Sequence, residues 1–354
     1  MIIKNIFSFV TSITSLFIIV LFSSISSKAD QNNIKYYSKD EGILSIMYHR
    51  FNESKYPSTN IKMDIFKEHV QIIKNSGFSF HNPHKFKEQF NSIKLKKEIL
   101  ITIDDAFESF YFEAWPYLKK NKIPFVLFVS TEPVGKNGYM TWDQIREVEK
   151  ESFTIIGHHS HSHSYLIDET TDEFMLDIKK ANKIFSKELG YIPKLFSYPF
   201  GEYSRFMRDF ISKNFEFAFG QHSGVIDVNK DKFELPRFPI DEKYGELKRF
   251  NSIINYFPLE YKKLLPLEKQ LIESTNPPNF KVEFFKEQKN LNNINCYSNE
   301  ANTWTKSDTT FLGTTLSIEF RAPFEPRRGR VNCSLNDNGK WRWFGIQFPI
   351  KKLN

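Results

Sequence analysis

The strongest constraint on the fold is a repeated alternation of short apolar runs and amphipathic segments between residues 43 and 219. The apolar runs lack the polar residue at every second position that a half-exposed strand shows, so they are typical of strands buried on both faces. Two of the segments between them begin with capping boxes, at Thr141 and Thr170. This pattern predicts an α/β fold in which helices cover a parallel sheet, either a barrel or a doubly wound sheet. The expected strands are 42–49, 98–103, 124–130, 153–157, 195–198 and 215–219, and the expected helices are 63–76, 108–121, a segment beginning at 141, 170–190 and 204–214.

The pattern changes near Pro258, and the chain after it is rich in Ser, Thr and Asn. Period-two alternation over 316–320 and 341–348 predicts a small β-rich module. We therefore expect a catalytic domain over 40–257 and a β-rich module over 270–354. Cys296 and Cys333 are the two cysteines of the chain. In an oxidising compartment they are expected to pair, and two free buried thiols are the alternative.

Residues 1–29 have the features of a secretory signal peptide. Lys4 precedes an apolar run over 6–22, and small residues lead to Ala29, after which we expect cleavage. An uncleaved membrane anchor is the alternative, because the run is close to the length that spans a bilayer. The signal predicts an exported protein, periplasmic or extracellular, with no transmembrane segment after cleavage.

The charge of the chain bears on its partners. The formal net charge is +7, and no basic block with interleaved aromatic residues is present, so no nucleic-acid partner is predicted. A modest positive charge is compatible with anionic polymers of a cell envelope, and equally with a lysine-rich coding bias. The oligomeric state is not defined by the sequence.

Two adjacent carboxylates, Asp104 and Asp105, directly follow the predicted strand 98–103. At the carboxyl end of a parallel strand both side chains can face one crevice, which is where sites form in α/β folds. Side by side, two carboxylates need a cation or a shared proton. The pair therefore indicates a metal site with one carboxylate free to act as a base. A helix N-cap is the alternative interpretation.

The segment 157–166 contains four of the nine histidines of the chain. His159 and His163 are four residues apart, a spacing that on a helical turn would bring both imidazoles to one metal ion. Ser160 stands where a zinc protease of the His-Glu-x-x-His type would carry glutamate, which disfavours a protease. A metal-binding histidine tract and a polar loop are the alternatives.

Two weaker signals also follow predicted strands. The run Tyr198-Pro199-Phe200-Gly201 ends one strand, and backbone N–H groups in such a turn can face a developing oxyanion. An ordinary strand-to-helix turn would look the same. His49 ends the strand 42–49, and a histidine there can act as a proton donor near neutral pH.

Together these motifs resemble those of the polysaccharide deacetylases, carbohydrate esterases that share a catalytic domain with the chitooligosaccharide deacetylases. Residues 102–106, Thr-Ile-Asp-Asp-Ala, resemble the family's Thr-Phe-Asp-Asp-Gly, and residues 159–163 match its His-Ser/Thr-x-x-His in full. Residues 198–201 resemble the end of its Arg-x-Pro-Tyr/Phe-Gly motif. The resemblance covers roughly residues 40–245.

The resemblance implies a distorted parallel (β/α) barrel with fewer strand–helix units than the usual eight. It implies that Asp104 is the catalytic base, and that Asp105, His159 and His163 bind a divalent metal. Zinc is the expected metal because the ligand set is rich in imidazole. Tyr198, Pro199 and Phe200 would lie at the substrate and its oxyanion. The implied reaction is hydrolysis of N-acetyl groups on an N-acetylhexosamine polysaccharide, with release of acetate.

The chain departs from the family pattern at three places. Ala106 replaces the glycine after the Asp pair, and the arginine of the third motif, which steadies the base in relatives, is absent. We hypothesise that Arg237 supplies that charge from another strand. The usual C-terminal Leu-x-His-Asp motif is also missing. In members that act on poly-N-acetylglucosamine it is permuted to the N-terminus as Tyr-His, which Tyr48-His49 fits, so His49 is assigned as the general acid.

Two other classes of function remain open on the sequence alone. One is an inactive relative that binds envelope glycans, motivated by the missing arginine, with Trp304, Trp341 and Trp343 as exposed sugar-stacking residues. The other is a periplasmic metal-binding protein built on the histidine cluster. The sequence does not name the polymer.

Overall fold

The computed structural model describes residues 41–91 and 97–352, so the predicted signal peptide lies outside the described residues. Its largest sheet has eight strands, in the order β10-β1-β5-β6-β7-β8-β9 with β4 paired to β5. Every pairing in this sheet is parallel, as predicted. The strands are β1 (Ile43–Tyr48), β4 (Ser79–Phe80), β5 (Glu98–Asp104), β6 (Phe125–Val129), β7 (Thr154–His158), β8 (Leu195–Ser197), β9 (Phe217–Phe219) and β10 (Phe238–Pro239). All six predicted strands are present. The sequence pattern did not predict β4 and β10, because two residues carry no periodicity.

A short segment joins the last strand of the sheet back towards the first. Phe219 of β9 forms a parallel bridge with Leu235. Three residues later, Phe238 of β10 pairs with Ile46 of β1. The segment 235–239 therefore curls the sheet into a distorted barrel that has fewer than eight strand–helix units. Of the two architectures left open by the sequence, a barrel and a doubly wound sheet, the structure shows the barrel.

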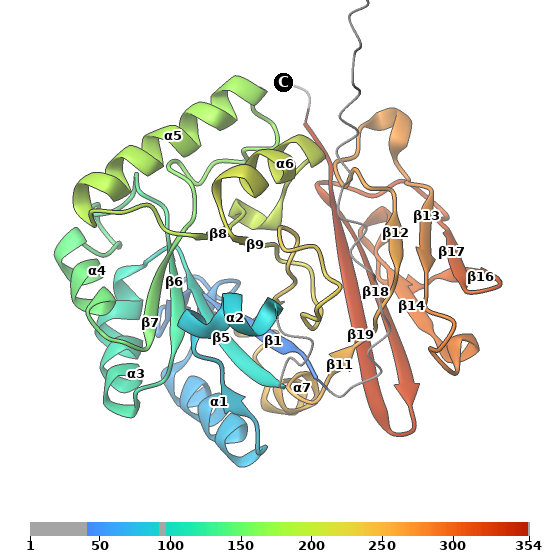
Figure 1. Ribbon diagram of the computed structural model, residues 1–354, viewed down its shortest axis with the longest axis horizontal. Helices are drawn as coiled ribbons and strands as arrows, with labels where there is room; N and C mark the ends of the chain where they lie inside the picture. The colour runs from blue at the N-terminus through green and yellow to red at the C-terminus, as the bar shows by residue number, and fades with distance from the viewer. Residues whose placement is uncertain (1–40, 92–96, 353–354) are drawn as a thin grey trace, which may run out of the picture. The chain divides into compact units, whose positions relative to one another are not determined.

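Helices surround the strands of the barrel (Figure 1). They are α1 (Met63–Asn75), α2 (Phe86–Asn91), α3 (Trp115–Asn121), α4 (Trp142–Glu149), α5 (Thr171–Glu188), α6 (Arg205–Asn214) and α7 (Leu247–Ile253). The capping boxes predicted at Thr141 and Thr170 are both formed. The helix expected over 108–121 begins with a π-helical turn, Phe110–Ala114, before α3. Short elements between these are β2 (Arg50–Phe51), β3 (Asn60–Ile61), and the 3₁₀ turns η1 (Pro83–Lys85) and η3 (Pro199–Gly201).

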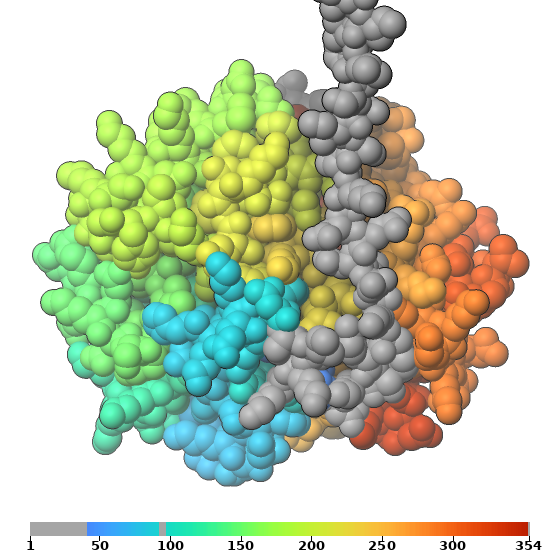
Figure 2. Space-filling model, viewed as in Figure 1, coloured from blue at the N-terminus to red at the C-terminus, as the bar shows by residue number. Residues whose placement is uncertain are grey.

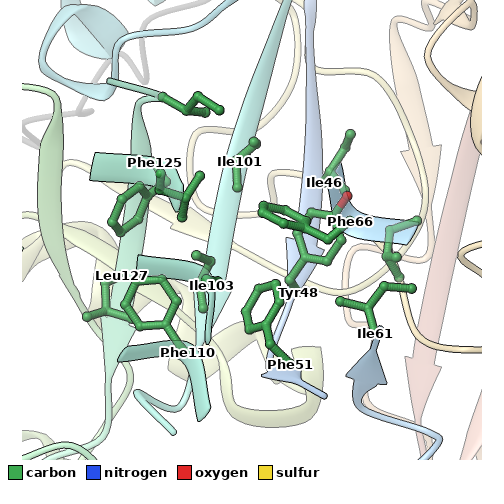
Figure 3. Close-up of a cluster of buried hydrophobic side chains, with 14 of the residues drawn as sticks. Ile46, Tyr48, Phe51, Ile61, Phe66, Ile101, Ile103, Phe110, Phe125 and Leu127 are labelled. Carbon is green, nitrogen blue, oxygen red and sulfur yellow. The ribbon is translucent and has the colours of Figure 1, made fainter. Parts of the chain in front are cut away.

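The strands at the centre of the barrel are buried on both faces. Figure 3 shows Ile46, Ile101 and Leu127, from β1, β5 and β6, gathered in one cluster with Phe66 of α1. Side chains from the opposite face of the same strands, such as Leu100, belong to a second cluster. Each fully buried aliphatic or aromatic side chain contributes about 1.5–3 kcal/mol relative to exposure. This double burial explains the continuous apolar runs and makes the strands a rigid support.

The C-terminal region forms two sheets, β11-β19-β18-β14-β15 and β12-β13-β17-β16. In β17, buried and partly exposed residues alternate, as the period-two pattern predicted over 316–320. The alternation predicted over 341–348 is wrong for most of its length, because β19 is buried at every position from Phe344 to Pro349. Cys296 of β14 and Cys333 of β18 are directly opposed and form a disulfide, which confirms the predicted pairing. The strands are β11 (Phe257–Pro258), β12 (Lys263–Leu265), β13 (Phe280–Glu283), β14 (Asn295–Ser298), β15 (Thr305–Lys306), β16 (Asp308–Leu312), β17 (Thr315–Glu319), β18 (Arg328–Asp337) and β19 (Lys340–Pro349), with 3₁₀ turns η4 (Glu273–Thr275), η5 (Leu291–Asn293) and η6 (Glu300–Asn302). The boundaries 40–257 and 270–354 stay a prediction.

The strand β19 brings the C-terminal sheets against the barrel. The ring of Trp343 stacks on Tyr256 with centroids 5.1 Å apart, and its indole N–H donates to Ser223 Oγ at 2.9 Å. Trp343 is therefore not an exposed sugar-stacking residue, whereas Trp304 and Trp341 are each 45% exposed. In Figure 2 the yellow segment that contains α6 lies beside the green segment that contains α5.

No helix among residues 41–91 and 97–352 is both long and apolar enough to span a bilayer.

Candidate active site

Polar residues from neighbouring strands meet at the carboxyl end of the barrel. Asp104 is the last residue of β5, Ser197 is the last residue of β8, and His159 directly follows β7. After Asp104 the chain turns sharply, because Asp105 and Ala106 both adopt left-handed backbone angles, with φ of 74° and 54°. The turn breaks the strand alternation, so Asp105 also faces the cluster. Neither carboxylate caps a helix.

Asp105, His159 and His163 bring three metal-type ligand atoms within 4.8 Å of one another. Asp105 Oδ1 lies 3.4 Å from His159 Nε2 and 3.1 Å from His163 Nε2. Asp105 Oδ1 and His159 Nε2 are buried without a hydrogen-bond partner. Buried polar atoms in proteins are normally paired, so two unpaired atoms aimed at one point fit a bound cation.

The ring of His159 is held in the tautomer that a metal ligand needs. Its Nδ1 lies 2.7 Å from the carbonyl oxygen of Ser197. A carbonyl can only accept, so Nδ1 carries the proton and donates it. Nε2 is then the unprotonated nitrogen, with its lone pair directed at Asp105. Such a hydrogen bond behind a ligating histidine commonly fixes its orientation.

The segment that carries the two histidines is an irregular loop, which corrects the expected helical turn. Ser160 and His163 adopt left-handed backbone angles, with φ of 71° and 54°. Asp177 of α5 accepts hydrogen bonds from the backbone N–H groups of His161 and Ser162, at 2.8 and 2.9 Å. His163 therefore reaches Asp105 by a fold-back of the loop that α5 holds in place.

The other two histidines of the segment point elsewhere. The ring of His158 packs among Phe185, Phe196 and Phe215. His161 Nδ1 lies 2.9 Å from the hydroxyl of Thr131. In the described part of the chain, the Asp105–His159–His163 cluster is the group of three or more metal-type side chains that the structure brings together.

Arg237 forms a two-pronged ion pair with Asp104 at the base of the cluster. Its terminal nitrogens lie 2.7 Å from Oδ1 and 2.8 Å from Oδ2 of Asp104. The same guanidinium donates to Ser197 Oγ at 2.8 Å and to the carbonyl of Gly220 at 2.9 Å. Both side chains of the pair are fully buried. The contact between Arg237 and Asp104 that we hypothesised from the sequence is thus present. Arg237 lies in the segment 235–239, which closes the barrel.

Both carboxylates are held in the ionised form. Burial by itself would raise the pKa of Asp104, but the charge of Arg237 and its hydrogen bonds to the carboxylate outweigh burial and keep that pKa below its usual value. For Asp105 burial is again opposed, here chiefly by the charge of His163 and its hydrogen bond, and the pKa lies well below its usual range. Two ionised carboxylates next to each other leave a strong demand for positive charge, which a divalent cation would meet.

His49 follows β1 at the same end of the barrel. Burial lowers its pKa, while the nearby carboxylates of Asp105 and Asp104 raise it. Its Nδ1 is buried without a hydrogen-bond partner among the described residues. The preceding residue, Tyr48, is packed in the core, where its hydroxyl contacts Nδ1 of His69 at 3.0 Å. Of the Tyr-His pair, only His49 is therefore available for chemistry.

The run 198–201 forms the 3₁₀ turn η3 at the edge of the cluster. Phe200 and Gly201 are both left-handed, with φ of 58° and 66°. The ring of Phe200 lies 4.7 Å from that of His163. The phenol of Tyr198 points into the core, where its hydroxyl donates to the carbonyl of Phe233. Any oxyanion contact from this run would thus come from the backbone of the turn and not from the phenol.

Comparison with known proteins shows which family this chain resembles. Residues 92–215 match the sequence model of the polysaccharide deacetylase family. Over this segment the chain is similar to the polysaccharide deacetylases. A poly-beta-1,6-N-acetyl-D-glucosamine N-deacetylase of Staphylococcus aureus (strain MSSA476) is 22% identical over 280 residues, which are 69% of this chain and 97% of the relative.

Solved structures of deacetylases share the fold. The Streptococcus pyogenes deacetylase PplD, in complex with acetate, superposes with a TM-score of 0.55 at 21% identity, over 61% of this chain and 99% of its own. IcaB from Ammonifex degensii gives a TM-score of 0.51 at 23% identity, over 60% of this chain and 97% of its own. At these identities the likeness concerns the fold of the barrel.

Two residues that position the candidate site were not predicted from the sequence. Ser197 holds His159 through its carbonyl and Arg237 through its hydroxyl. Its position directly before the turn 198–201 was the sequence feature that could have predicted this role. Asp177, in the middle of α5, supports the loop that carries His159 and His163. In the sequence, the only feature that could have indicated this role was an aspartate at a buried position of the helix.

Proposed function

We propose that this chain is a metal-dependent N-deacetylase that hydrolyses acetamide groups on an N-acetylhexosamine polymer and releases acetate. The observation that carries the proposal is a buried, arginine-paired Asp104 beside three ligand atoms within 4.8 Å of one another. Asp104 Oδ2 is 3.7 Å from His159 Nε2, so base and ligand set border the same space. A water molecule there can be deprotonated while it attacks a carbonyl.

Asp105, His159 and His163 are the residues that would hold the metal. A cation bound there would polarise the acetyl carbonyl and lower the pKa of the attacking water. Zinc is the metal we propose, because two of the three ligands are imidazoles. Burial of Asp105 and His159 strengthens their interaction with the cation, since water does not screen it.

Asp104 acts as the general base in this proposal. Its fork with Arg237 fixes both oxygens and keeps the carboxylate ionised, so it can accept the proton of the attacking water. His49 gives a proton to the leaving amine. Because burial lowers the pKa of His49, its proton is released readily once acquired. The backbone N–H of Phe200 is the proposed donor to the developing oxyanion.

The substrate class follows from the relatives and not from the geometry. The Staphylococcus aureus relative is named for poly-beta-1,6-N-acetyl-D-glucosamine. We propose a polymer of this type as substrate. An exported location, periplasmic or extracellular, is part of the proposal, because such polymers lie outside the cytoplasm.

The test is release of acetate from N-acetylglucosamine oligomers by purified residues 30–354, with and without added zinc. The Asp104→Asn variant serves as the matched control, because it keeps the shape of the side chain and removes its basicity. Zinc-dependent release that is lost in the variant would support the proposal. Release that is equal in the variant would contradict the role of Asp104.

The two alternative classes have less support. The missing arginine motivated an inactive glycan binder, but Arg237 occupies the position beside Asp104. A metal-storage role would need several sites, and two of the four clustered histidines point away from the metal-type ligands. Glycan binding without turnover would revive the first class, and more than one zinc ion per chain would revive the second.

A further inference from the structure

The β18–β19 hairpin of the C-terminal region touches the residues that flank the metal-type ligands. Arg327, which directly precedes β18, places its guanidinium 3.8 Å from the ring centroid of Tyr165. The opposite face of Tyr165 stacks on Phe200, with centroids 4.0 Å apart and planes 17° from parallel. Phe200 in turn meets the ring of His163 edge-on at 4.7 Å. A continuous stack therefore runs from Arg327 to the ligand His163.

Arg327 also contacts residues that follow the histidine segment 157–166 and the turn 198–201. It donates to Asp168 at 2.6 Å, five residues after His163. It forms a fork with Glu202, at 3.2 and 2.8 Å, directly after the turn 198–201. Arg328 donates to the same Glu202 at 2.6 Å. Glu202 is 2% exposed, so its forked contact with Arg327 is geometrically defined and largely shielded from water.

Gln347 of β19 holds the turn from another direction. Its amide nitrogen donates to the carbonyl oxygens of Phe200 and Gly201, at 3.1 and 3.2 Å. Phe200 has a left-handed φ of 58°, which is unfavourable for a residue with a side chain. Such a conformation persists only where the surroundings determine it. Gln347 and the stack supply those surroundings from outside the barrel.

We propose that the β18–β19 hairpin is a positioning part of the metal site, with Arg327 and Gln347 fixing the Tyr165–Phe200 pair against His163. His163 needs such support because it stands on a left-handed residue of an irregular loop and its side chain is 25% exposed. His159, by contrast, is fully buried and held by Ser197. The inference rests on the proposed function, since it assumes that His163 binds a metal.

The test measures the affinity of the folded protein for zinc alone, by competition with a chromogenic chelator. Arg327→Met and Tyr165→Leu each remove one layer of the stack. Partners that orient metal-binding histidines are worth roughly 10–100-fold in affinity, so we expect about tenfold weaker zinc binding in each. Tyr165→Phe keeps the ring and should restore the affinity of the unmodified protein.

Trp343→Phe is the matched control at the same interface. It removes the hydrogen bond from the indole to Ser223, a residue outside the turn 198–201. It should leave zinc affinity unchanged. If it weakened zinc binding as much as Arg327→Met, general loosening of the interface would explain the effect and the inference would be overturned.

Two further outcomes decide the remaining cases. If Arg327→Met does not fold, Tyr165→Leu decides alone, because Tyr165 is 41% exposed and its truncation breaks no ion pair. Normal zinc affinity in Tyr165→Leu would overturn the inference. A protein that binds zinc without releasing acetate would contradict the proposed function, while the affinity series would still test the stack.

Discussion

The barrel and the C-terminal sheets use β-structure in opposite ways. In the barrel, parallel strands are buried on both faces, and charged residues such as Asp104 stand at strand ends. In the C-terminal region, the antiparallel strand β18 alternates buried and partly exposed residues from Arg328 to Leu335. The barrel therefore concentrates its chemistry at one edge, while the C-terminal sheets spread their polar residues over a face.

The difference teaches how the two regions divide their roles. The parallel sheet supplies rigid, closely spaced strand ends, which suit a metal cluster. The C-terminal sheets have a hydrophobic core of their own and the Cys296–Cys333 disulfide. Their contribution to the site comes from contacts made by Arg327 and Gln347 at the interface. Four predictions test this division, from the largest expected effect to the smallest.

The largest effects are expected from the two carboxylates at the barrel edge. Asp104→Asn should retain zinc binding and lower kcat by about 10²–10⁴, because the general base is lost. Asp105→Asn should instead abolish zinc binding, because a charged ligand is lost. Zinc titration and acetate release on both variants measure this. Normal zinc binding by both would contradict the assignment.

Arg237→Met should lower the free energy of unfolding by about 3–5 kcal/mol and remove activity, because it leaves the buried charge of Asp104 without a partner. Urea unfolding measures the loss. Arg237→Lys, which keeps the charge but not the fork, should lose less stability. Full activity in Arg237→Met would show that the ion pair is dispensable for the reaction.

Replacing both Cys296 and Cys333 by alanine tests the C-terminal region. The bridge spans 37 residues, and a loop of that size contributes roughly 3–4 kcal/mol in the chain-entropy description. We expect this loss in urea unfolding, with unchanged zinc affinity in the folded protein. An equal loss of zinc affinity under native conditions would mean that the two regions are not separable in this way.

The smallest effect concerns acid stability of the barrel. Burial lowers the pKa of His69 to about 4, against 6.5 when unfolded. With this pKa the ring is neutral at pH 7. Its Nε2 donates to the carbonyl of Gly245, which leaves Nδ1 as the acceptor for the hydroxyl of Tyr48. The unfolded chain thus binds more protons, so stability present above pH 6.5 is lost as the pH falls towards 4.

We expect about 2 kcal/mol of this loss between pH 7 and pH 5. Urea unfolding at the two pH values measures it, and His69→Gln should show a shallower dependence on pH. An identical slope in the variant would assign the acid sensitivity to other groups.

Local patterns in the sequence were enough for the order of the six predicted strands of the barrel and for the three side chains of the metal-type cluster. Apolar runs buried on both faces carry their own signal, and so do capping boxes and the Asp104–Asp105 pair at a strand end. The helical turn expected around His159 and His163 was wrong, because Ser160 and His163 adopt left-handed angles that their residue types do not announce. The site was nevertheless assembled, because the fold-back restores the spacing that the helix would have provided.

What the sequence by itself determined is therefore the class of fold and the residues able to bind a metal, since both depend on residues near one another in the chain. Only the tertiary structure decided which charge accompanies the base and what supports the metal ligands. Arg237 reaches Asp104 across 133 residues because the segment 235–239 closes the barrel. Gln347 reaches Phe200 across 147 residues because β19 packs on that barrel. No local pattern encodes such contacts, because they form only when elements distant in sequence pack together.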